Sequence, residues 1–555
     1  EEAAQGRWER AERRLKEAAR ACASTGLAFR CARVHRQLMD LYVALHRPND
    51  AHRHAFEGLR LAREAREWKL ERELLQGLAQ ISRFRNGRSL AHAYLEESLS
   101  RDPADCVQQA YVHEELAAVD LVELRRTEAR EEMSRAVRAS LGCNRPLSLS
   151  GALVLAELAR AGGLPDDERA LRQALDAVHA RRASPGERVL ATAIEGRFEL
   201  ERDRPKGLAL LQRAASDAEP LGGDVNALKA RALAYTALTL DAGKAGAFGQ
   251  ALELLTRQLR TDAPRGCVLG VMVDDERTLL VARGSDGEVL GHYDQRRTRP
   301  LENELSGLVP SPILQALERG CERVAVLAPP PVNGRAGLLP SHLAWSYRLG
   351  TARPERPSRL PERRLVVANV KPPEALRLEP LRTWAGGEAA DALVLLSGAQ
   401  ATPSRVMEEM RSSTEIEVHA HGLLDPEISD ASLLALSPDD SGRYALTAGE
   451  LRQAALEGAP LVLLAACEAA HTAPQLHQPY SLPAAFLQAG ARVVLAATVK
   501  IPDDEAPRFF DAVRARIRAG APPAVAVRDE RQAWLARQPA GGTEHRWVEG
   551  VLVFE

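Results

Sequence analysis

The 555-residue chain carries 74 lysine and arginine residues against 76 aspartate and glutamate residues, a formal net charge of −2 at pH 7. Its length exceeds what one hydrophobic core usually organises, so we expect at least two domains. The balanced charge does not suggest a nucleic-acid-binding surface, and no apolar run approaches the roughly 20 residues needed to cross a bilayer. We therefore expect neither a direct nucleic acid partner nor a membrane partner.

The seven cysteines are odd in number and include no C-x-x-C pair. This pattern is typical of a reducing compartment and gives no sign of structural zinc. Neither glycine-rich nucleotide-binding motif, G-x-x-x-x-G-K-[ST] or G-x-G-x-x-G, is present. The sequence predicts a cytoplasmic protein without a metal or another cofactor.

The N-terminal half repeats one alanine-rich template, in which small and large side chains recur at the spacing of a helix face. Copies begin at residues 11, 51, 91, 129, 167, 207 and 247, so the period is 38–40 residues; the first three read "AERRLKEAA", "AHRHAFEGL" and "AHAYLEESL". A second helical stretch, such as "ARVHRQLMDLYVAL", lies between copies. Two helices per repeat predict an α-solenoid of about seven repeats over residues 1–262, in which stacking supplies the core.

These repeats resemble tetratricopeptide repeats in an elongated form, since the usual period is about 34 residues. The resemblance implies a surface that binds a partner. A scaffold without any ligand is the alternative.

After "RTDAPRG" the composition changes. The runs "CVLGVMV", "RTLLVAR" and "EVLGHY" predict an antiparallel meander. Apolar strands then alternate with amphipathic helices, and the strands include "RVAVLAP", "RLVVANV", "EIEVHAHG", "APLVLLAAC" and "ARVVLAATV". We predict an α/β domain over residues 263–555 with a mostly parallel, partly mixed sheet, whose sites form beyond the carboxyl ends of the strands. The basic segment "RPERPSRLPERR", 353–364, is interpreted as a solvated linker, with a self-cleavage or activation loop as the alternative.

Two strand ends carry the residues of a candidate catalytic site. Cys467 follows "LVLLAA", and alone it would be interpreted as a small buried hydrophobe. His421 and Gly422 end another predicted strand 46 residues earlier, and adjacent parallel strands would bring the two ends together. There a thiolate of Cys467 can attack a peptide carbonyl, the imidazole of His421 can protonate the leaving amine, and the N–H of Gly422 can bind the oxyanion.

Other residues compete for these roles. The pair His419 and His421 could hold a metal, but no third ligand stands at a suitable spacing. His471 and His477 could serve as the base, although they lie on the same connection as Cys467.

The segments "EIEVHAHG", "LVLLAACEAA", "AFLQAGARVVLAATVKIPDDEA" and "HRWVEGVLVF" resemble the successive motifs of the CHAT family, which contains caspase-like and separase-like cysteine peptidases often fused to tetratricopeptide repeats. The similarity spans roughly 265–555. It implies a caspase-like domain with a dyad of His421 and Cys467 and an oxyanion hole at Gly422.

In the separase branch of that family, an acid after the "AGARVVLAATV"-type strand lines the pocket for the residue before the cut. The resemblance therefore implies Asp503 or Asp504 as substrate-binding residues. Lys500 stands where that branch prefers an acid, and a valine stands where tryptophan is usual. The alternative for the two aspartates is the N-cap and first turn of a helix over 505–519.

The resemblance to repeat-fused members implies a cysteine endopeptidase that cleaves a specific partner protein in bacterial antiviral defence or programmed cell death. An activating protein or ribonucleoprotein complex on the repeats would gate the activity. The alternative is a non-catalytic adaptor, whose repeats and degenerate peptidase domain scaffold a signalling complex.

Overall fold

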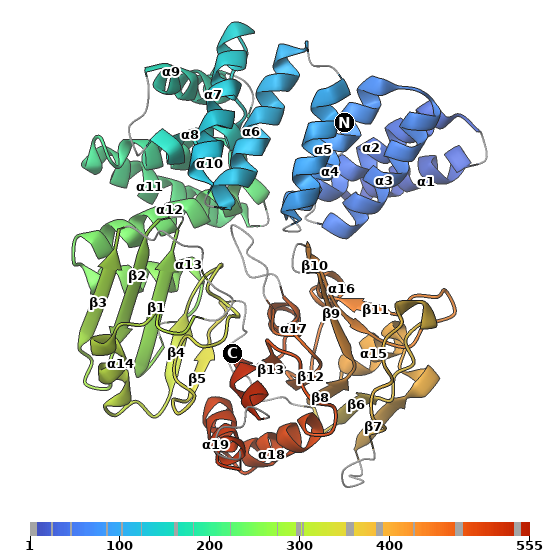
Figure 1. Ribbon diagram of the computed structural model, residues 1–555, viewed down its shortest axis with the longest axis vertical. Coiled ribbons are helices and arrows are strands. Elements are labelled where there is room, and N and C mark those ends of the chain that lie inside the picture. Colours follow the sequence, from blue (N-terminus) through green and yellow to red (C-terminus); the bar gives the residue numbers. More distant parts are fainter. Residues whose placement is uncertain are drawn as a thin grey trace. The chain divides into compact units, whose positions relative to one another are not determined.

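The computed structural model describes residues 8–555 except 24–25, 45–46, 85–86, 102–103, 124, 160–164, 181–182, 223, 263, 275, 296–300, 302–304, 351–359, 385–391, 426–427, 472–480 and 538–544. The chain divides into two compact units, residues 1–238 and 239–555 (Figure 1).

The first unit consists of helices. Helices that follow one another in the chain pack side by side, and alternate helices such as the second and fourth also touch, which is the packing of an α-solenoid as predicted. The helices are α1 (Trp8–Ala23), α2 (Ala28–Ala44), α3 (Pro48–Glu64), α4 (Trp68–Phe84), α5 (Arg88–Arg101), α6 (Cys106–Val122), α7 (Arg126–Gly142), α8 (Leu149–Ala159), α9 (Pro165–Ala180), α10 (Pro185–Glu199), α11 (Arg204–Ala218) and the 3-10 turn η2 (Glu219–Leu221). The division between the units falls within the next helix, α12 (Val225–Lys244).

The repeated template explains why these helices approach one another closely. Its copies fall in α1, α3, α5, α7, α9, α11 and, in the second unit, α13 (Phe248–Gln258). The small first residues Ala51, Ala91 and Ala129 are fully buried. At Gly207 a Cβ atom would lie 2.5 Å from the Cα of Leu200, so even a methyl group has no room there.

The seventh copy of the template packs on the sheet of the second unit. Leu252 and Leu255 of α13 share a core with Val268, and a Cβ at Gly291 would lie 2.1 Å from the ring of Phe248. The compact units therefore divide at 238/239, whereas the sequence predicted a boundary at 262/263. The helical pattern continues past residue 239, so periodicity alone does not reveal this division.

The second unit is built on one long sheet with the strand order β3-β2-β1-β4-β5-β14-β13-β12-β8-β6-β7. The first three strands form the predicted antiparallel meander, the last strand of the chain is antiparallel to β13, and the other pairs are parallel. The strands are β1 (Cys267–Val273), β2 (Thr278–Arg283), β3 (Val289–Asp294), β4 (Val324–Leu327), β5 (Trp345–Tyr347), β6 (Arg364–Ala368), β7 (Leu393–Ser397), β8 (Glu415–His419), β12 (Leu461–Ala465), β13 (Val493–Ala497) and β14 (Val551–Phe554). The predicted mostly parallel, partly mixed sheet is confirmed.

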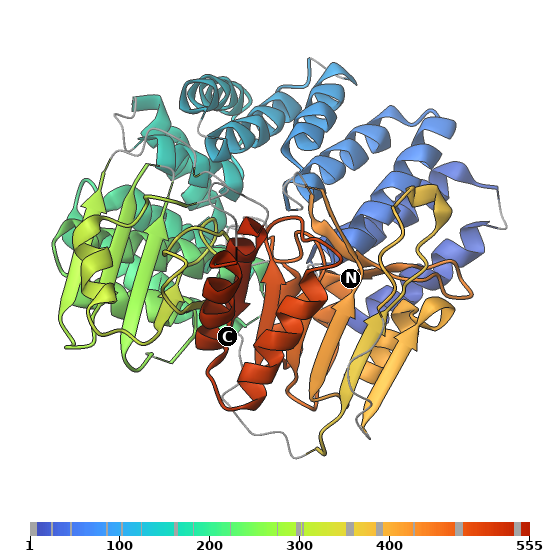
Figure 2. The same cartoon turned by 60° about the horizontal axis from the view of Figure 1, so that its bottom comes forward.

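Helices cover both faces of this sheet. One core includes residues of α14 (Ser311–Glu318), α15 (Pro403–Met410), α16 (Ala448–Leu451) and α17 (Leu482–Ala489), whereas α18 (Ala506–Arg518) and α19 (Pro523–Leu535) cover the other face (Figure 2). Along β12, Val462 and Leu464 join the first core, and Leu461 and Leu463 join the second. Burial on both faces explains the uninterrupted apolar run of this strand. Short 3-10 turns are η3 (Glu374–Leu376), η4 (Gly398–Gln400) and η5 (Arg546–Gly550).

A second sheet of three strands begins directly after β8. It contains β9 (His421–Asp425), β10 (Ile428–Ala435) and β11 (Ala445–Thr447) in the order β11-β10-β9. The prediction that His421 and Gly422 end a core strand is therefore wrong: β8 stops at His419, and these two residues open β9. Both segments are extended, so the sequence pattern does not show where the backbone leaves one sheet for the other.

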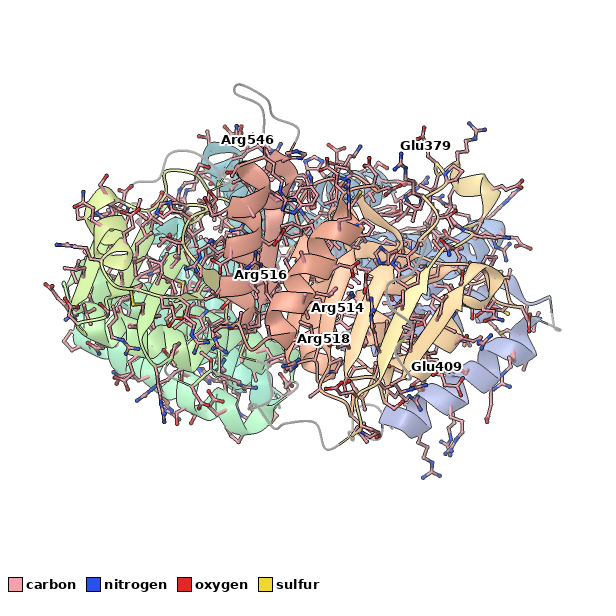
Figure 3. The ribbon with its side chains drawn as sticks, turned by 90° about the horizontal axis from the view of Figure 1, so that it is seen from below. Glu379, Glu409, Arg514, Arg516, Arg518 and Arg546 are labelled. Atoms are coloured by element: carbon pink, nitrogen blue, oxygen red, sulfur yellow. A yellow bond between two sulfur atoms is a disulfide. The ribbon has the colours of Figure 1, made fainter. Side chains whose placement is uncertain are left out.

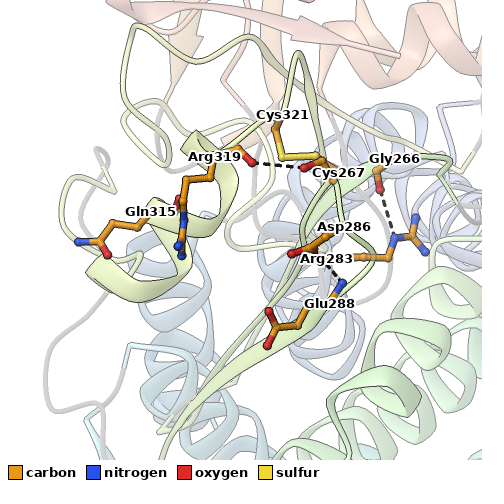
Figure 4. The surroundings of a disulfide bond; sticks show 9 residues. Gly266, Cys267, Arg283, Asp286, Glu288, Gln315, Arg319 and Cys321 are labelled. Atoms are coloured by element: carbon orange, nitrogen blue, oxygen red, sulfur yellow. Dashed lines mark hydrogen bonds between the residues drawn. A yellow bond between two sulfur atoms is a disulfide. The ribbon is translucent and has the colours of Figure 1, made fainter.

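Two cysteine pairs are joined as disulfides, in contrast to the reduced thiols expected from the sequence. Cys106 is bonded to Cys143 and Cys267 to Cys321, while Cys22, Cys31 and Cys467 form no disulfide. The second bond links the start of β1 to the turn before β4 (Figure 4). These strands pair in parallel, with Cys267 opposite Val324, which brings Cys321 close. No described helix has both the length and the apolar character needed to span a membrane.

Candidate active site

The strands that carry the two candidate catalytic residues are neighbours in the sheet. β8 and β12 pair in parallel, and their last register pair joins Ala465 to His419. His421 and Cys467 each follow this last pair by two residues. Both residues lie just beyond the carboxyl ends of the strands, where sites of parallel sheets form.

Gly422 lies against the backbone of Cys467. A Cβ atom at position 422 would stand 1.9 Å from the carbonyl oxygen of Cys467 and 3.5 Å from its nitrogen. The glycine is therefore required by the approach of two segments of the chain itself. The sequence predicts a role for the N–H of Gly422, and the structure adds a reason for its missing side chain.

The sulfur of Cys467 faces the side of the sheet covered by α18 and α19, and it is only partly buried. The backbone N–H of Ile501 donates a hydrogen bond to Sγ over 3.5 Å. Burial raises the pKa of the Cys467 thiol, the Ile501 hydrogen bond lowers it, and the nearby carboxylates of Asp503 and Glu468 raise it further. The net shift is upward, so this arrangement favours the neutral thiol.

The residue after Cys467 has an unusual backbone conformation. Glu468 has a φ of +53°, in the left-handed region that non-glycine residues rarely adopt. Its N–H donates to the carbonyl of Val499, and the N–H of Ala470 donates to that of Ala497. These bonds hold the turn against β13 and the loop after it. Such strain is often found at functional sites, because it persists only where the surroundings impose it.

The ring of His421 is held by a backbone carbonyl. Nε2 lies 2.8 Å from the oxygen of Glu379, in the segment that follows β6. A carbonyl can only accept a hydrogen bond, so Nε2 carries the proton and, in the neutral ring, Nδ1 carries the lone pair. Figure 3 shows Glu379 at the end of the sheet opposite Glu409, which pairs with Arg363 just before β6. Glu379 thus lies at the carboxyl ends of the strands.

The two candidate catalytic side chains do not bond to each other in this conformation. Among the described residues, Sγ of Cys467 makes its hydrogen-bond contacts with the main chain of Ile501, and His421 makes its own with Glu379. The backbone segments are in contact while the two side chains have other partners.

A buried charge cluster lies on β8 beneath the candidate site. Glu417 is 1 % exposed and accepts hydrogen bonds from Arg364 and from Arg514 of α18, which is labelled in Figure 3. Its other oxygen lies 2.7 Å from Nε2 of His419. Burial would raise the pKa of Glu417, but the hydrogen bond and charge of His419, together with the two arginines, lower it to about 2.

This cluster bears on the alternative role of His419. Its Nε2 is occupied by the carboxylate of Glu417, which accounts for this histidine without a metal. Among the described residues, no group of three or more His, Cys, Asp or Glu side chains could hold a metal ion.

The predicted substrate-binding acids lie in the turn before α18. Asp503 and Asp504 are exposed, and the N-cap of α18 is Glu505, which makes no capping hydrogen bond from its side chain. The N-cap alternative thus assigned the wrong residues. The carboxylate of Asp504 lies 3.7 Å from the guanidinium of Arg382, on the same segment as Glu379.

The other candidates can be placed in part. His471 is half-buried, and its backbone N–H donates to the carbonyl of Glu468, so it lies on the turn that follows Cys467. Burial lowers the pKa of the His471 ring, and the charge of Arg335 lowers it further. His477 and residues 353–359 of the basic connector lie outside the described residues.

Two features of the site were missed by the sequence reading. Glu417 lies in the strand "EIEVH", whose alternation of polar and apolar residues is typical of a strand with one solvated face, so the sequence gives no sign that this acid is buried. The carbonyl of Glu379 has no sequence sign either, because any residue supplies a carbonyl.

Comparison with known proteins identifies the α/β region. Residues 311–550 match the family model of the CHAT domain. Two crystal structures of the Saccharomyces cerevisiae separase–securin complex, at 3.0 and 2.6 Å resolution, are similar at 8 % and 9 % identity, each with a TM-score of 0.41 and each over 95 % of this chain. The matches cover 53 % and 54 % of those chains, so this chain spans about half their length. No curated protein matches the sequence. The sequence resemblance to the CHAT family is thus confirmed over residues 311–550.

Proposed function

We propose that the chain is a cysteine endopeptidase in which His421 and Cys467 form the catalytic dyad. The observation that carries this proposal is the contact between the backbones of Gly422 and Cys467 just beyond the ends of β8 and β12, within the region that matches the CHAT domain. Because the backbones are close, we expect side-chain rotation and small backbone shifts to be enough to bring the imidazole to the sulfur.

In the proposed reaction, the sulfur of Cys467 attacks the carbonyl carbon of the scissile peptide bond and forms a tetrahedral oxyanion. The N–H groups of Gly422 and Cys467 stabilise that oxyanion. The ring of His421 takes the thiol proton on Nδ1 and passes it to the leaving amine as the C–N bond breaks. Water then hydrolyses the thioester, with His421 as the general base.

The proposal includes a gate. The thiol of Cys467 is held by Ile501 and has a raised pKa, and this arrangement suits a resting state. Misplacement by about 1 Å can cost roughly a hundredfold in rate. A partner protein or ribonucleoprotein complex bound to the repeats would need to shift the dyad only slightly. The substrate would be one dedicated protein, in bacterial antiviral defence or programmed cell death.

Asp503 and Asp504 are proposed to receive a basic side chain of the substrate before the cut. Two observations support this: the charge of Asp503 acts on Cys467, and Asp504 faces a guanidinium of the chain itself. Both acids are exposed and therefore accessible to a substrate.

The alternative is a non-catalytic adaptor, and one observation favours it. The sulfur and the imidazole have separate hydrogen-bond partners, as a domain retained only as a scaffold would permit.

Labelling with iodoacetamide separates the two functions. The purified chain and its His421→Ala variant are treated at pH 7, and modification of each cysteine is followed by peptide mass spectrometry. The rate at Cys467 is compared between the two proteins, and Cys22, which forms no disulfide, is the control for general reactivity. The peptidase proposal predicts faster modification of Cys467 in the parent than in the variant and no change at Cys22. Equal rates in both proteins would favour the adaptor.

A further inference from the structure

A strap of residues 370–384 leaves the carboxyl end of β6 and crosses to the candidate site. Main-chain hydrogen bonds within the strap form a short turn, from Leu376 to Pro373 and from Arg377 to Glu374. None of its residues is fully buried, although Val370 at its start packs against the core of the sheet. The strap therefore depends on a few side-chain contacts for its position.

Asn369, the residue before the strap, joins both of its ends. Its Oδ1 accepts a hydrogen bond of 2.8 Å from the backbone N–H of Trp384, and its Nδ2 donates to Oγ of Ser397 at the end of β7 over 3.1 Å. Its φ of +51° lies in the left-handed region, which asparagine tolerates better than most residues. The amide thus closes the strap into a loop fixed to the sheet.

Closing the strap places its middle on the catalytic histidine. Trp384 stands with its ring centroid 6.1 Å from that of His419, two residues before His421. The carbonyl of Glu379 accepts the hydrogen bond from Nε2 of His421. At the other end of the strap, the N–H of Lys371 donates to Oγ of Ser437. The hydrogen bonds of Lys371 and Trp384 hold the two ends of the strap, and the hydrogen bond with His421 lies between them.

We propose that Asn369 is a positioning residue of the active site. By closing the strap, its Oδ1 keeps the Glu379 carbonyl on Nε2 of His421, and this fixes the ring in the tautomer whose Nδ1 can take the proton of Cys467. The inference rests on the proposed function for its catalytic meaning, whereas the tautomer itself can be observed without any activity.

Two substitutions of Asn369 distinguish the effect of its acceptor oxygen from the effect of its left-handed backbone conformation. Asn369→Gly keeps the left-handed backbone and removes Oδ1. Asn369→Asp keeps Oδ1, and the hydroxyl of Ser397 can then donate to the carboxylate. Ser397→Ala is the matched control, since it removes a bond of the same side chain on the side away from the strap. Thermal unfolding of all three variants reports any general loss of stability.

The decisive readout is the nitrogen NMR spectrum of the histidine side chains in the ¹⁵N-histidine-labelled full chain, with the His421 signals assigned by their loss in His421→Gln. We expect one tautomer, protonated on Nε2, in the parent, in Asn369→Asp and in Ser397→Ala. We expect a mixture in Asn369→Gly, together with a rate of Cys467 alkylation that falls about two- to tenfold, the equivalent of one lost hydrogen bond.

Two results would overturn the inference: an unchanged tautomer in Asn369→Gly, or the same mixture in Asn369→Gly and Asn369→Asp. A different result would count against the proposed function alone. In that result, the tautomer of His421 responds to substitution of Asn369 as expected, but alkylation of Cys467 is insensitive to His421→Ala. The strap would then position the ring of His421, but this ring would not be the base for Cys467.

Discussion

Replacing Gly422 with alanine would separate the two strand ends on which the proposed dyad depends. The added Cβ would stand 1.9 Å from the carbonyl oxygen of Cys467, whereas real Cβ contacts essentially never fall below 3.0 Å. The obstacle is backbone, so no side chain can rotate away. The two segments must therefore recede by about 1 Å, a displacement that costs roughly a hundredfold in rate when it separates a nucleophile from its base.

The assay for Gly422→Ala is the rate at which a peptidyl acyloxymethyl ketone alkylates Cys467, followed by intact mass. In that reaction the Sγ–C bond forms as the carboxylate leaves. Gly249→Ala is the matched control, because nothing lies within 4 Å of a Cβ at that position. We expect a fall of about a hundredfold for Gly422→Ala and no change for Gly249→Ala. If Gly422→Ala remains folded by thermal unfolding and alkylates at the parental rate, the reasoning about the strand ends is refuted.

Three further predictions concern charged residues. Glu417→Gln removes the buried carboxylate shared by Arg364 and Arg514 and leaves them only the partly exposed Asp511, so chemical denaturation should show a loss of about 3 kcal/mol. The pKa of Glu417 is lowered to about 2, so its ionised form stabilises the fold above about pH 4.5. In an acid titration of stability, this contribution should be lost as the pH falls towards 2 in the parent. Glu417→Gln should not show the loss. Arg382→Gln frees Asp504 from its ion pair, so the cation p-aminobenzamidine should bind about two- to fivefold more tightly, as measured by its fluorescence. Arg377→Gln on the same strap is the control and should not increase the affinity.

Much of the fold follows from local patterns. The period of 38–40 residues predicts paired helices because the buried faces at Ala51, Ala91 and Ala129 need a close neighbour. The uninterrupted run "LVLLA" predicts a strand covered on both sides, and β12 is one. In both cases, residues that are close together in the sequence indicate which side chains are buried.

The parts that the sequence does not reveal depend on contacts between distant segments. The division of the units after residue 238 depends on which surface α13 covers, and its helical pattern is the same in either position. The bond between Cys267 and Cys321 requires β1 and β4 to be adjacent. The conformation of Glu468 and the hydrogen bond from His421 to Glu379 involve backbone atoms, which every residue type provides.

The measurement that tests the central claim most directly is the identification of new protein N-termini in cells that express this chain. Cells producing the parent, Cys467→Ala and His421→Ala chains at equal levels are compared by N-terminal proteomics, with Cys22→Ala as the control for loss of a cysteine outside the proposed dyad. We predict a small set of cleavage sites that appears with the parent and with Cys22→Ala and is absent from the other two. The same set in cells producing Cys467→Ala would show that this sulfur is not the nucleophile.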